Sequence, residues 1–256
     1  MNRIFQYLIL FFLFPGTFIF SKDSNICTIC LKQLNKYYSI DAWNNAFHSY
    51  HENEGEYCHS CSRIISQNIT NGGYVYSDGR SICSLCQASA ITNSSGFHLS
   101  YQSVIEQLSL IGINSIPHNI PINLTGLNQL RNIAKDQSHS KLKGCTRNKQ
   151  NYLSYQYQIY ILNGLPKIEF EAVLAHELMH IWLNIKKIKL PDKYIEGFCN
   201  LGSYLVYKND GTQFSKIHLK AMDKNPDPKY GEGYRLMKKM LLNAGWKDLI
   251  IKLNTL

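Results

Sequence analysis

The clearest helical pattern in the chain lies between residues 165 and 188. Apolar residues recur there at intervals of three and four positions, which is the period of a buried helix face. Pro166 suits the first turn of a helix, because its missing N–H needs no partner there, and Pro191 ends the pattern. The sequence therefore predicts a long, mostly buried helix, followed after Pro191 by a second helix that folds back.

Weaker patterns surround this helix. Residues 101–111 have helical spacing, residues 116–124 contain two prolines and are predicted to be extended, and residues 152–162 alternate as in a strand. The polar stretch 131–150 is predicted to contain the loops, and no internal repeat is visible. Residues 88–98 are rich in Ser, Thr, Asn and Gly, which favours a domain boundary. Helices with one short sheet predict an α+β fold.

The N-terminus has a pattern of its own. Arg3 is the only charge before an apolar run from Ile4 to Phe20, and such a run after a short basic start is typical of a secretory signal peptide. Residues 1–21 are predicted to be this signal, with cleavage near Ser21. The alternative is an uncleaved membrane anchor, which Pro15 weakens as a helix. In both cases the rest of the chain is predicted to lie outside the cytoplasm, as a secreted, periplasmic or anchored protein.

Composition and charge narrow the class of protein. With 256 residues, 45% hydrophobic and 18% charged, the chain is typical of a globular protein. Its net charge of +9 is spread along the chain without a basic stripe interleaved with aromatics, so no nucleic-acid partner is predicted. The densest lysine group, Lys186, Lys187 and Lys189, is interpreted as the solvated end of the long helix.

Four pairs of metal-ligating residues follow one another near the N-terminus, and two residues separate the members of each pair. A tight turn of this spacing points two side chains at one ion, and zinc prefers four such ligands in a tetrahedron. Two structural zinc sites are predicted, one made by Cys27, Cys30, His48 and His51 and the other by Cys58, Cys61, Cys83 and Cys86. Residues 25–88 would then form a LIM-like double zinc-knuckle module. The alternative, disulfides in an exported protein, leaves the two histidines unexplained.

The long predicted helix carries the motif from His176 to His180 with Glu177 between them. A spacing of four residues puts both imidazoles on one helix face, so that they can bind one zinc ion. Glu177 is predicted to be the general base that takes a proton from a water acidified by the zinc and passes it to the leaving amine. The motif predicts a zinc metallopeptidase that hydrolyses peptide bonds.

A catalytic zinc needs a third protein ligand and one open position. Glu196 is the predicted third ligand, because the second helix would return its carboxylate to the metal. Asp192 is the alternative ligand, although it also suits the N-cap of that helix. No histidine follows His180 before His218, which disfavours a set of three histidines.

With these residues in place, the chain resembles the LIM-domain peptidases of the plant organ-size-regulator ("DA-one") family and their short bacterial relatives. The resemblance rests on the paired zinc ligands and on four segments in the same order, 164–166, 174–182, 196–199 and 230–235. It implies a zincin-type metallopeptidase domain over residues 99–256, with a short sheet and glutamate as the third ligand. It also implies one catalytic zinc beside the two structural ones, and a protein substrate.

The chain departs from that family in two places. The gap from His51 to Cys58 is longer than the two-residue spacer of a standard LIM domain, and His48 stands where a cysteine is common. The plant members are tied to ubiquitin, whereas an exported chain would not meet it, so that partner is not expected. The LIM-like module is expected to support the structure, to position the substrate, to regulate access or to bind a protein partner.

Three questions stay open in the sequence. Tyr230 or Tyr234 could stabilise the oxyanion, or both could be packed aromatics at a helix start. Cys145 and Cys199 could pair or remain buried thiols. The alternatives to an active peptidase are a non-catalytic LIM-like interaction protein on a peptidase scaffold and a zymogen whose N-terminal module masks the zinc.

Overall fold

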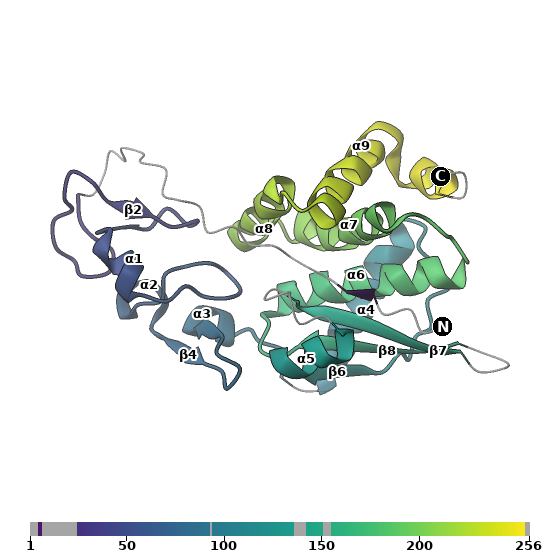
Figure 1. Ribbon diagram of the computed structural model, residues 1–256, viewed down its shortest axis with the longest axis horizontal. Coiled ribbons are helices and arrows are strands. Elements are labelled where there is room, and N and C mark those ends of the chain that lie inside the picture. The colour runs from purple at the N-terminus through teal and green to yellow at the C-terminus, as the bar shows by residue number, and fades with distance from the viewer. Residues whose placement is uncertain (1–4, 7–24, 93, 136–141, 151–154, 254–256) are drawn as a thin grey trace. The chain divides into compact units, whose positions relative to one another are not determined.

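A computed structural model describes residues 5–6, 25–92, 94–135, 142–150 and 155–253 (Figure 1). The chain divides into two compact units. The larger contains Met1–Phe11, Ile91–Asn163 and Lys167–Leu256, and the smaller contains Phe12–Ala90 and Gly164–Pro166. Apart from two residues, the predicted signal peptide lies outside the described part of the chain. Among the described helices, none has the length and apolarity needed to cross a membrane.

The larger unit contains a four-stranded sheet in the order β1-β7-β8-β6. The central pair, β7 (Gly144–Gln150) and β8 (Tyr155–Leu162), is antiparallel. β6 (Ile122–Thr125) runs parallel to β8, and the two-residue β1 (Phe5–Gln6) pairs antiparallel with β7. The strand predicted over residues 152–162 is confirmed from Tyr155 onward, and residues 152–154 lie outside the described structure.

β7 lies in the polar stretch 131–150, where the sequence predicted loops and no strand. All seven of its residues pair with β8, from Gly144 opposite Ile161 to Gln150 opposite Tyr155. Its composition is polar, so neither alternation nor an apolar run marks it in the sequence. The strand forms because β8 pairs with it. Hydrogen bonds to an ordered neighbouring strand satisfy the backbone N–H and C=O groups of β7 whatever its side chains are.

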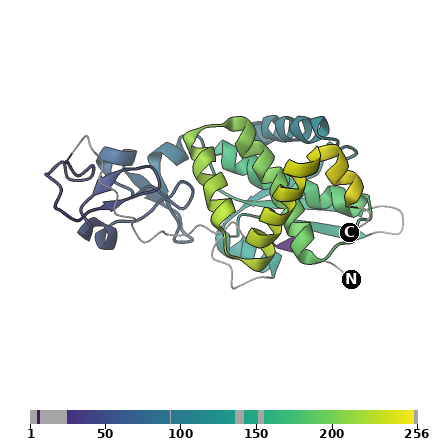
Figure 2. The same ribbon diagram turned by 90° about the horizontal axis from the view of Figure 1, so that it is seen from above.

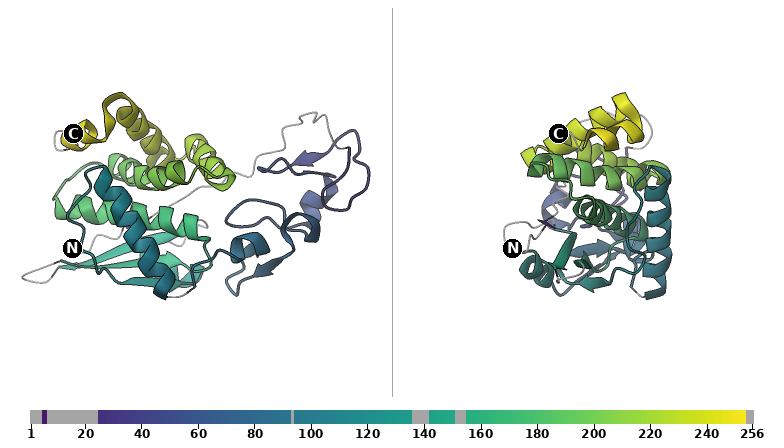
Figure 3. Two further views of the ribbon diagram at one scale, coloured as in Figure 1. Left: turned by 180° about the vertical axis from the view of Figure 1, so that it is seen from behind. Right: turned by 90° about the vertical axis from the view of Figure 1, so that its right-hand side faces the viewer.

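Helices pack on this sheet in successive layers. The predicted long helix is confirmed as α6 (Lys167–Ile185), which packs against β7 and β8 and also against α7 (Asp192–Asp210) (Figure 1). α4 (Ser94–Leu110) packs against α6 and α7, as the view from behind shows (Figure 3). It begins well before residue 101, where the sequence pattern placed its start, so the predicted boundary at 88–98 runs into a helix.

The remaining helices lie outside this core. α8 (Gln213–Lys224), the π-helical segment η1 (Pro228–Glu232) and α9 (Gly233–Lys252) cover α7 in the view from above (Figure 2). α5 (Leu127–Ala134) packs against β7 and β8 and was not predicted. Helices with a small sheet confirm the α+β mixture expected from the sequence.

A buried ion pair joins the start of β7 to the first turn of α6. The Lys143 ammonium contacts the Glu169 carboxylate, and both side chains are almost completely buried. Glu169 lies in the first turn of α6, where its charge also favours the helix dipole. Removing one partner of such a pair typically costs about 3–5 kcal/mol, because the other charge stays buried alone. The pair therefore fixes the strand against the helix just before the residues of the site.

The smaller unit is built from short hairpins and single helical turns around its cysteines. Its hairpins and helices are β2 (Ser39–Ile40) with β3 (Ala46–Phe47), β4 (Gly73–Val75) with β5 (Ser81–Cys83), and the helices α1 (Tyr50–Glu54), α2 (Gln67–Thr70) and α3 (Ser84–Gln87). Cys27, Leu34, Phe47 and Ile64 form a small apolar core. A core of this size holds little free energy of folding by itself.

The backbone of the smaller unit repeats, which the sequence did not reveal. The turn after Cys27 has Leu31 in the left-handed region, and the turn after Cys58 has Ser62 there. In each turn the N–H of that residue donates to the carbonyl of the first cysteine. Each turn is also closed by an antiparallel bridge at the same relative position. The unit thus contains two knuckles of one design.

Candidate metal centres

Helices α6 and α7 bring three predicted ligands together. His176 and His180 lie one turn apart on α6, and their Nε2 atoms are 3.2 Å apart. Glu196 of α7 places its Oε2 3.5 Å from His176 Nε2 and 3.6 Å from His180 Nε2. Atoms bound to one zinc ion at tetrahedral angles lie about 3.3–3.4 Å apart, given the usual bond lengths. The three atoms therefore have the spacing of one face of a zinc tetrahedron.

Burial suits these three side chains to a metal. All three are almost inaccessible to solvent, and burial lowers the pKa values of His176 and His180 well below their usual range. Neutral imidazoles are the form that binds metals. Burial also raises the pKa of Glu196, whose Oε2 accepts no hydrogen bond from any described residue. A buried carboxylate oxygen without a donor is costly, and a bound cation would remove that cost.

Glu177 lies beside this cluster but is not part of it. Its Oε2 accepts a hydrogen bond of 2.6 Å from the Thr146 hydroxyl, whereas its buried Oε1 has no partner in the described structure. Burial raises the pKa of Glu177 well above its usual range, and the nearby charge of Glu196 adds to this effect. A raised pKa makes this carboxylate a better proton acceptor than an exposed glutamate would be.

Two glycines permit the close packing around the cluster. A Cβ added at Gly144 would collide with the Glu177 carboxylate and would lie 2.6 Å from Val173 Cγ1. A Cβ at Gly202 would lie 2.6 Å from Met179 Sδ and 3.0 Å from the backbone of Ala175. Glycine at these positions lets β7 approach Glu177 and lets α7 approach the motif helix.

α7 supplies a second polar group that the sequence analysis missed. Asn200 hydrogen-bonds to His176 through its side chain, and its Nδ2 donates to the carbonyl of Tyr230 at 3.1 Å. Metal-binding histidines usually have such a partner on the second ring nitrogen, which fixes the ring orientation. The available signal was spacing, because Glu196 and Asn200 are four residues apart and share a helix face.

Asp192 has neither of the two roles predicted for it, as metal ligand or as N-cap. The N-cap of α7 is Pro191, and Asp192 is the first helical residue. Its carboxylate accepts a hydrogen bond of 3.1 Å from Lys229 Nζ and does not join the ligand cluster. Lys229 Nζ also lies 3.8 Å from Glu196 Oε1, the oxygen turned away from the histidines. The lysine therefore contacts the outer oxygen of the third ligand.

Tyr230 and Tyr234 lie at the junction of η1 and α9. Both are buried, and Gly233 between them packs tightly against Gly197 of α7. Tyr230 contributes its backbone carbonyl to Asn200, while the Tyr234 hydroxyl has no hydrogen-bond partner among the described residues. This is the packed helix start that the sequence left as an alternative. The predicted oxyanion role stays a prediction.

The first knuckle cluster gathers Cys27, Cys30, His48 and His51. Cys30 Sγ lies 3.4 Å from His48 Nδ1, close to the roughly 3.6 Å expected for sulfur and nitrogen on one zinc. The other nitrogen of His48 lies 2.9 Å from the carbonyl of Gln33. Nδ1, which is also 3.4 Å from the Tyr50 hydroxyl, is therefore the nitrogen that faces Cys30 and could bind a metal. Hydrogen bonding from His51 is the main reason why the pKa of Cys30 falls to about 6. Cys30 and His51 remain partly exposed.

The second knuckle cluster is made of Cys58, Cys61, Cys83 and Cys86, and all four are buried. The Sγ atoms of Cys61 and Cys83 are 3.7 Å apart, and two thiolates on one zinc lie about 3.8 Å apart. Hydrogen bonding from Cys61 lowers the pKa of Cys58 to about 6. The Cys83 N–H donates to Cys58 Sγ at 3.3 Å, which supports negative charge on that sulfur.

The remaining two cysteines are buried thiols. None of the eight cysteines forms a disulfide, so the structure keeps Cys145 and Cys199 unpaired. Burial raises both pKa values, and the charge of Glu177 raises them further. These thiols are therefore poor nucleophiles near neutral pH.

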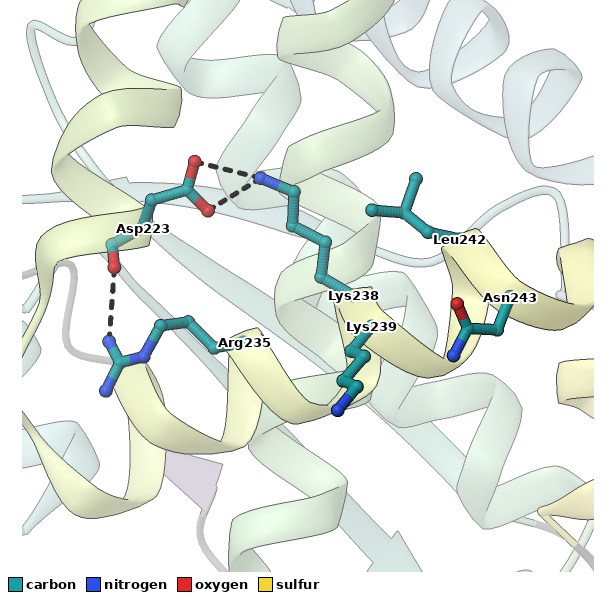
Figure 4. Close-up of a pocket in the computed structure, with 6 residues that line it drawn as sticks. All are labelled: Asp223, Arg235, Lys238, Lys239, Leu242 and Asn243. Carbon is teal, nitrogen blue, oxygen red and sulfur yellow. Dashed lines mark hydrogen bonds and ion pairs between the residues drawn. The ribbon is translucent and has the colours of Figure 1, made fainter.

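A surface groove between α8 and α9 has a volume of about 280 Å³ (Figure 4). It is lined by Asp223, Arg235, Lys238, Lys239, Leu242 and Asn243, none of which is a candidate ligand. Lys238 points to the Asp223 carboxylate, at 2.6 Å, so its charge is already paired. The groove therefore contains none of the predicted catalytic or zinc-binding residues.

Taken together, the geometry defines an α+β protein with two four-ligand clusters compatible with zinc knuckles and one three-ligand cluster on a helix pair. Residues 124–216 match the DA1-like family, described as Protein DA1. That stretch runs from β6 to the start of α8 and contains His176, Glu177, His180 and Glu196.

Two curated relatives extend this similarity. Protein DA1-related 2 of Arabidopsis thaliana is 26% identical over 204 residues, which cover 64% of this chain and 37% of the relative. LIM domain-containing protein HDR3 of Oryza sativa subsp. japonica is 25% identical over 221 residues, 70% of this chain and 43% of the relative. The chain spans less than half the length of these relatives, and no solved structure matches it. The similarity supports a relationship to the plant DA1 family, and the Cys/His clusters together with a LIM-domain relative indicate zinc binding.

Proposed function

We propose that this chain is an exported zinc metallopeptidase of the zincin type that hydrolyses peptide bonds in protein substrates. It would bind one catalytic zinc at His176, His180 and Glu196 and two structural zincs in the knuckle clusters. Glu177 would be the general base. The similarity to the DA1-like family, and to a relative named for its LIM domain, supports the same assignment.

One observation carries the proposal. Three buried ligand atoms have zinc-like spacing. Glu177, on the same helix as two of them, is outside the cluster, feels the charge of Glu196 and has one oxygen without a described partner. Three protein ligands leave one coordination position for a substrate or water, whereas four ligands close a site. A purely structural site has no use for a neighbouring glutamate of raised pKa.

Zinc at this cluster would supply a Lewis acid that polarises the scissile carbonyl and acidifies water. The residues of the chain then have separate tasks. Glu177 Oε1 takes the proton of the attacking water and later delivers it to the leaving amine nitrogen. Asn200 holds the His176 ring in orientation, and Tyr230 or Tyr234 remains the candidate donor to the oxyanion.

The smaller unit would position a protein substrate, regulate access or bind a protein partner. Each knuckle cluster offers four ligands and therefore no open position for catalysis. Several large apolar side chains in this unit are exposed, including Tyr74 and Val75 on β4. This exposure favours the second candidate function, a non-catalytic LIM-like interaction protein, if the catalytic test below fails.

The test combines zinc counting with a cleavage assay on an unfolded protein such as casein. Three zincs per chain are expected, and Glu177→Gln should keep all three while losing about 10²–10⁴-fold in activity, the usual contribution of a general base. Glu171→Gln on the same helix is the matched control, since Glu171 pairs with Lys167 instead of facing the cluster. Two zincs per chain, or unchanged cleavage by Glu177→Gln, would refute the catalytic proposal.

A further inference from the structure

The proposed base has one neighbour whose function the proposed reaction does not assign. Thr146 lies on the polar strand β7, and its hydroxyl donates a 2.6 Å hydrogen bond to Glu177 Oε2. Thr146 is 4% exposed and Glu177 is completely buried, so water does not compete for this bond. A short bond from a hydroxyl to a buried carboxylate is among the stronger hydrogen bonds in proteins.

The two carboxylate oxygens of Glu177 differ in their hydrogen bonding. Oε2 is held by Thr146, whereas Oε1 has no hydrogen-bond partner among the residues described. The backbone at Gly144 passes so close to Oε1 that any side chain there would collide with it. The strand therefore limits the rotation of the carboxylate from two sides and still leaves one oxygen unused.

We propose that Thr146 is a positioning residue for Glu177, which fixes one oxygen of the base so that the other stays directed to the reacting water. This inference rests on the proposed peptidase function. In the reaction, Oε1 accepts one proton from water, the water oxygen bonds to the carbonyl carbon, and the same proton leaves with the amine as the C–N bond breaks. The Thr146 hydroxyl keeps its own proton throughout.

The competing explanation is that Thr146 only supplies a hydrogen bond that a buried carboxylate needs for stability. Both explanations predict some loss of stability when the hydroxyl is removed, because a buried acceptor then loses its donor. The two explanations differ in the kcat that they predict for a variant without the hydroxyl. A positioning role lowers kcat and spares KM, because the bond acts on the orientation of the base and contacts no substrate.

The experiment compares Thr146→Val, which keeps the shape and removes the hydroxyl, with Thr146→Ser, which keeps the hydroxyl. Thr146→Val should lower kcat by about 10- to 100-fold, as expected for a lost hydrogen bond to a charged group. KM should stay within about two-fold, and the zinc content and zinc dissociation constant should not change. Thr146→Ser should recover most of kcat. Wild-type kcat in Thr146→Val, an equal defect in Thr146→Ser, or a defect that follows zinc loss would overturn the inference.

A second readout needs no turnover. Acetohydroxamate binds zinc and hydrogen-bonds to a correctly placed neighbouring carboxylate, so calorimetry should show roughly 3- to 10-fold weaker binding to zinc-loaded Thr146→Val. Equal binding to wild type and Thr146→Val would count against the positioning role. Wild-type protein that binds zinc but cleaves nothing would refute the peptidase proposal alone, because the calorimetric comparison would still report on Thr146.

Discussion

The two units of the chain use similar residues in opposite ways. The smaller unit gathers four ligands in each cluster, whereas the larger gathers three and places Glu177 beside them. Four protein ligands would saturate a zinc ion, so the proposed function gives the knuckle zincs a structural role. Three ligands leave a position at which chemistry can occur. The number of protein ligands, more than their identity, therefore separates the two proposed roles.

The clusters also differ in what holds them. Each knuckle is a local turn, and the unit around it has only a small apolar core. The three-ligand cluster depends on two long helices that are packed in a large core and fixed by glycine contacts. We therefore expect the smaller unit to need its metal in order to fold, and the larger unit to fold without it.

The strongest test of this difference removes one ligand from each kind of cluster. Cys83→Ser should unfold the smaller unit, because structural zinc contributes about 10–16 kcal/mol in isolated zinc-finger peptides. His180→Ala should lose one zinc and leave both units folded. Limited proteolysis with zinc counting distinguishes the two variants. The comparison fails if Cys83→Ser resists the protease as wild type does, or if His180→Ala is degraded.

Partial chelation should distinguish the three-ligand site from the knuckle clusters in one sample, because the sites should lose zinc at different chelator concentrations. A dry cluster of four thiolates ought to hold zinc more tightly than three nitrogen and oxygen ligands. Titration with a competing chelator should therefore abolish cleavage while about two zincs per chain remain, as the three-ligand site empties first. Activity that persists until the last zinc is removed would contradict this order.

Asn200→Ala should weaken only the three-ligand site. Loss of a hydrogen bond to a metal-binding histidine typically lowers metal affinity by about 10- to 100-fold. Zinc affinity is measured by competition with an indicator. Asn209→Ala is the control on the same helix, since Asn209 is exposed and bonds to Gln107. Equal affinities in the two variants would show that Asn200 does not orient His176.

The smallest effect is expected from a single added methyl group. Gly144→Ala should cost about 1–3 kcal/mol of unfolding free energy through overpacking, and it should also lower kcat because it displaces Glu177. Gly211→Ala is the control, because it strains a left-handed turn (φ 63°) far from any crowding and should cost about 1 kcal/mol without a change in kcat. Denaturant unfolding and steady-state rates together separate the two variants.

The sequence predicts those parts of the molecule that local rules determine. The long helix around His176, the helix that follows Pro191 and the four spaced ligand pairs all follow from periodicity or spacing. The structure brings each predicted ligand set together. Their roles in zinc binding and catalysis remain predictions.

The parts that the sequence did not predict depend on partners distant in the chain. β7 is polar, and it becomes a strand because β8 pairs with it. The bond from Thr146 to Glu177, the contact of Lys229 with Asp192 and the buried pair of Lys143 and Glu169 each join separate elements. No local pattern encodes such pairs. The N-cap of α7 differs for a smaller reason, since the helix begins at Asp192, one residue earlier than an Asp192 N-cap would place it.

The ligand types of His176, His180 and Glu196 also restrict which ions can bind. Two of the three ligand atoms are imidazole nitrogens, and the edges of 3.2–3.6 Å match bonds of about 2.0–2.1 Å at tetrahedral angles. Calcium takes six to eight oxygen ligands, so a set of two nitrogens and one carboxylate disfavours it. Discrimination between ions is then a matter of ligand chemistry, because nitrogen donors favour zinc and similar ions over calcium.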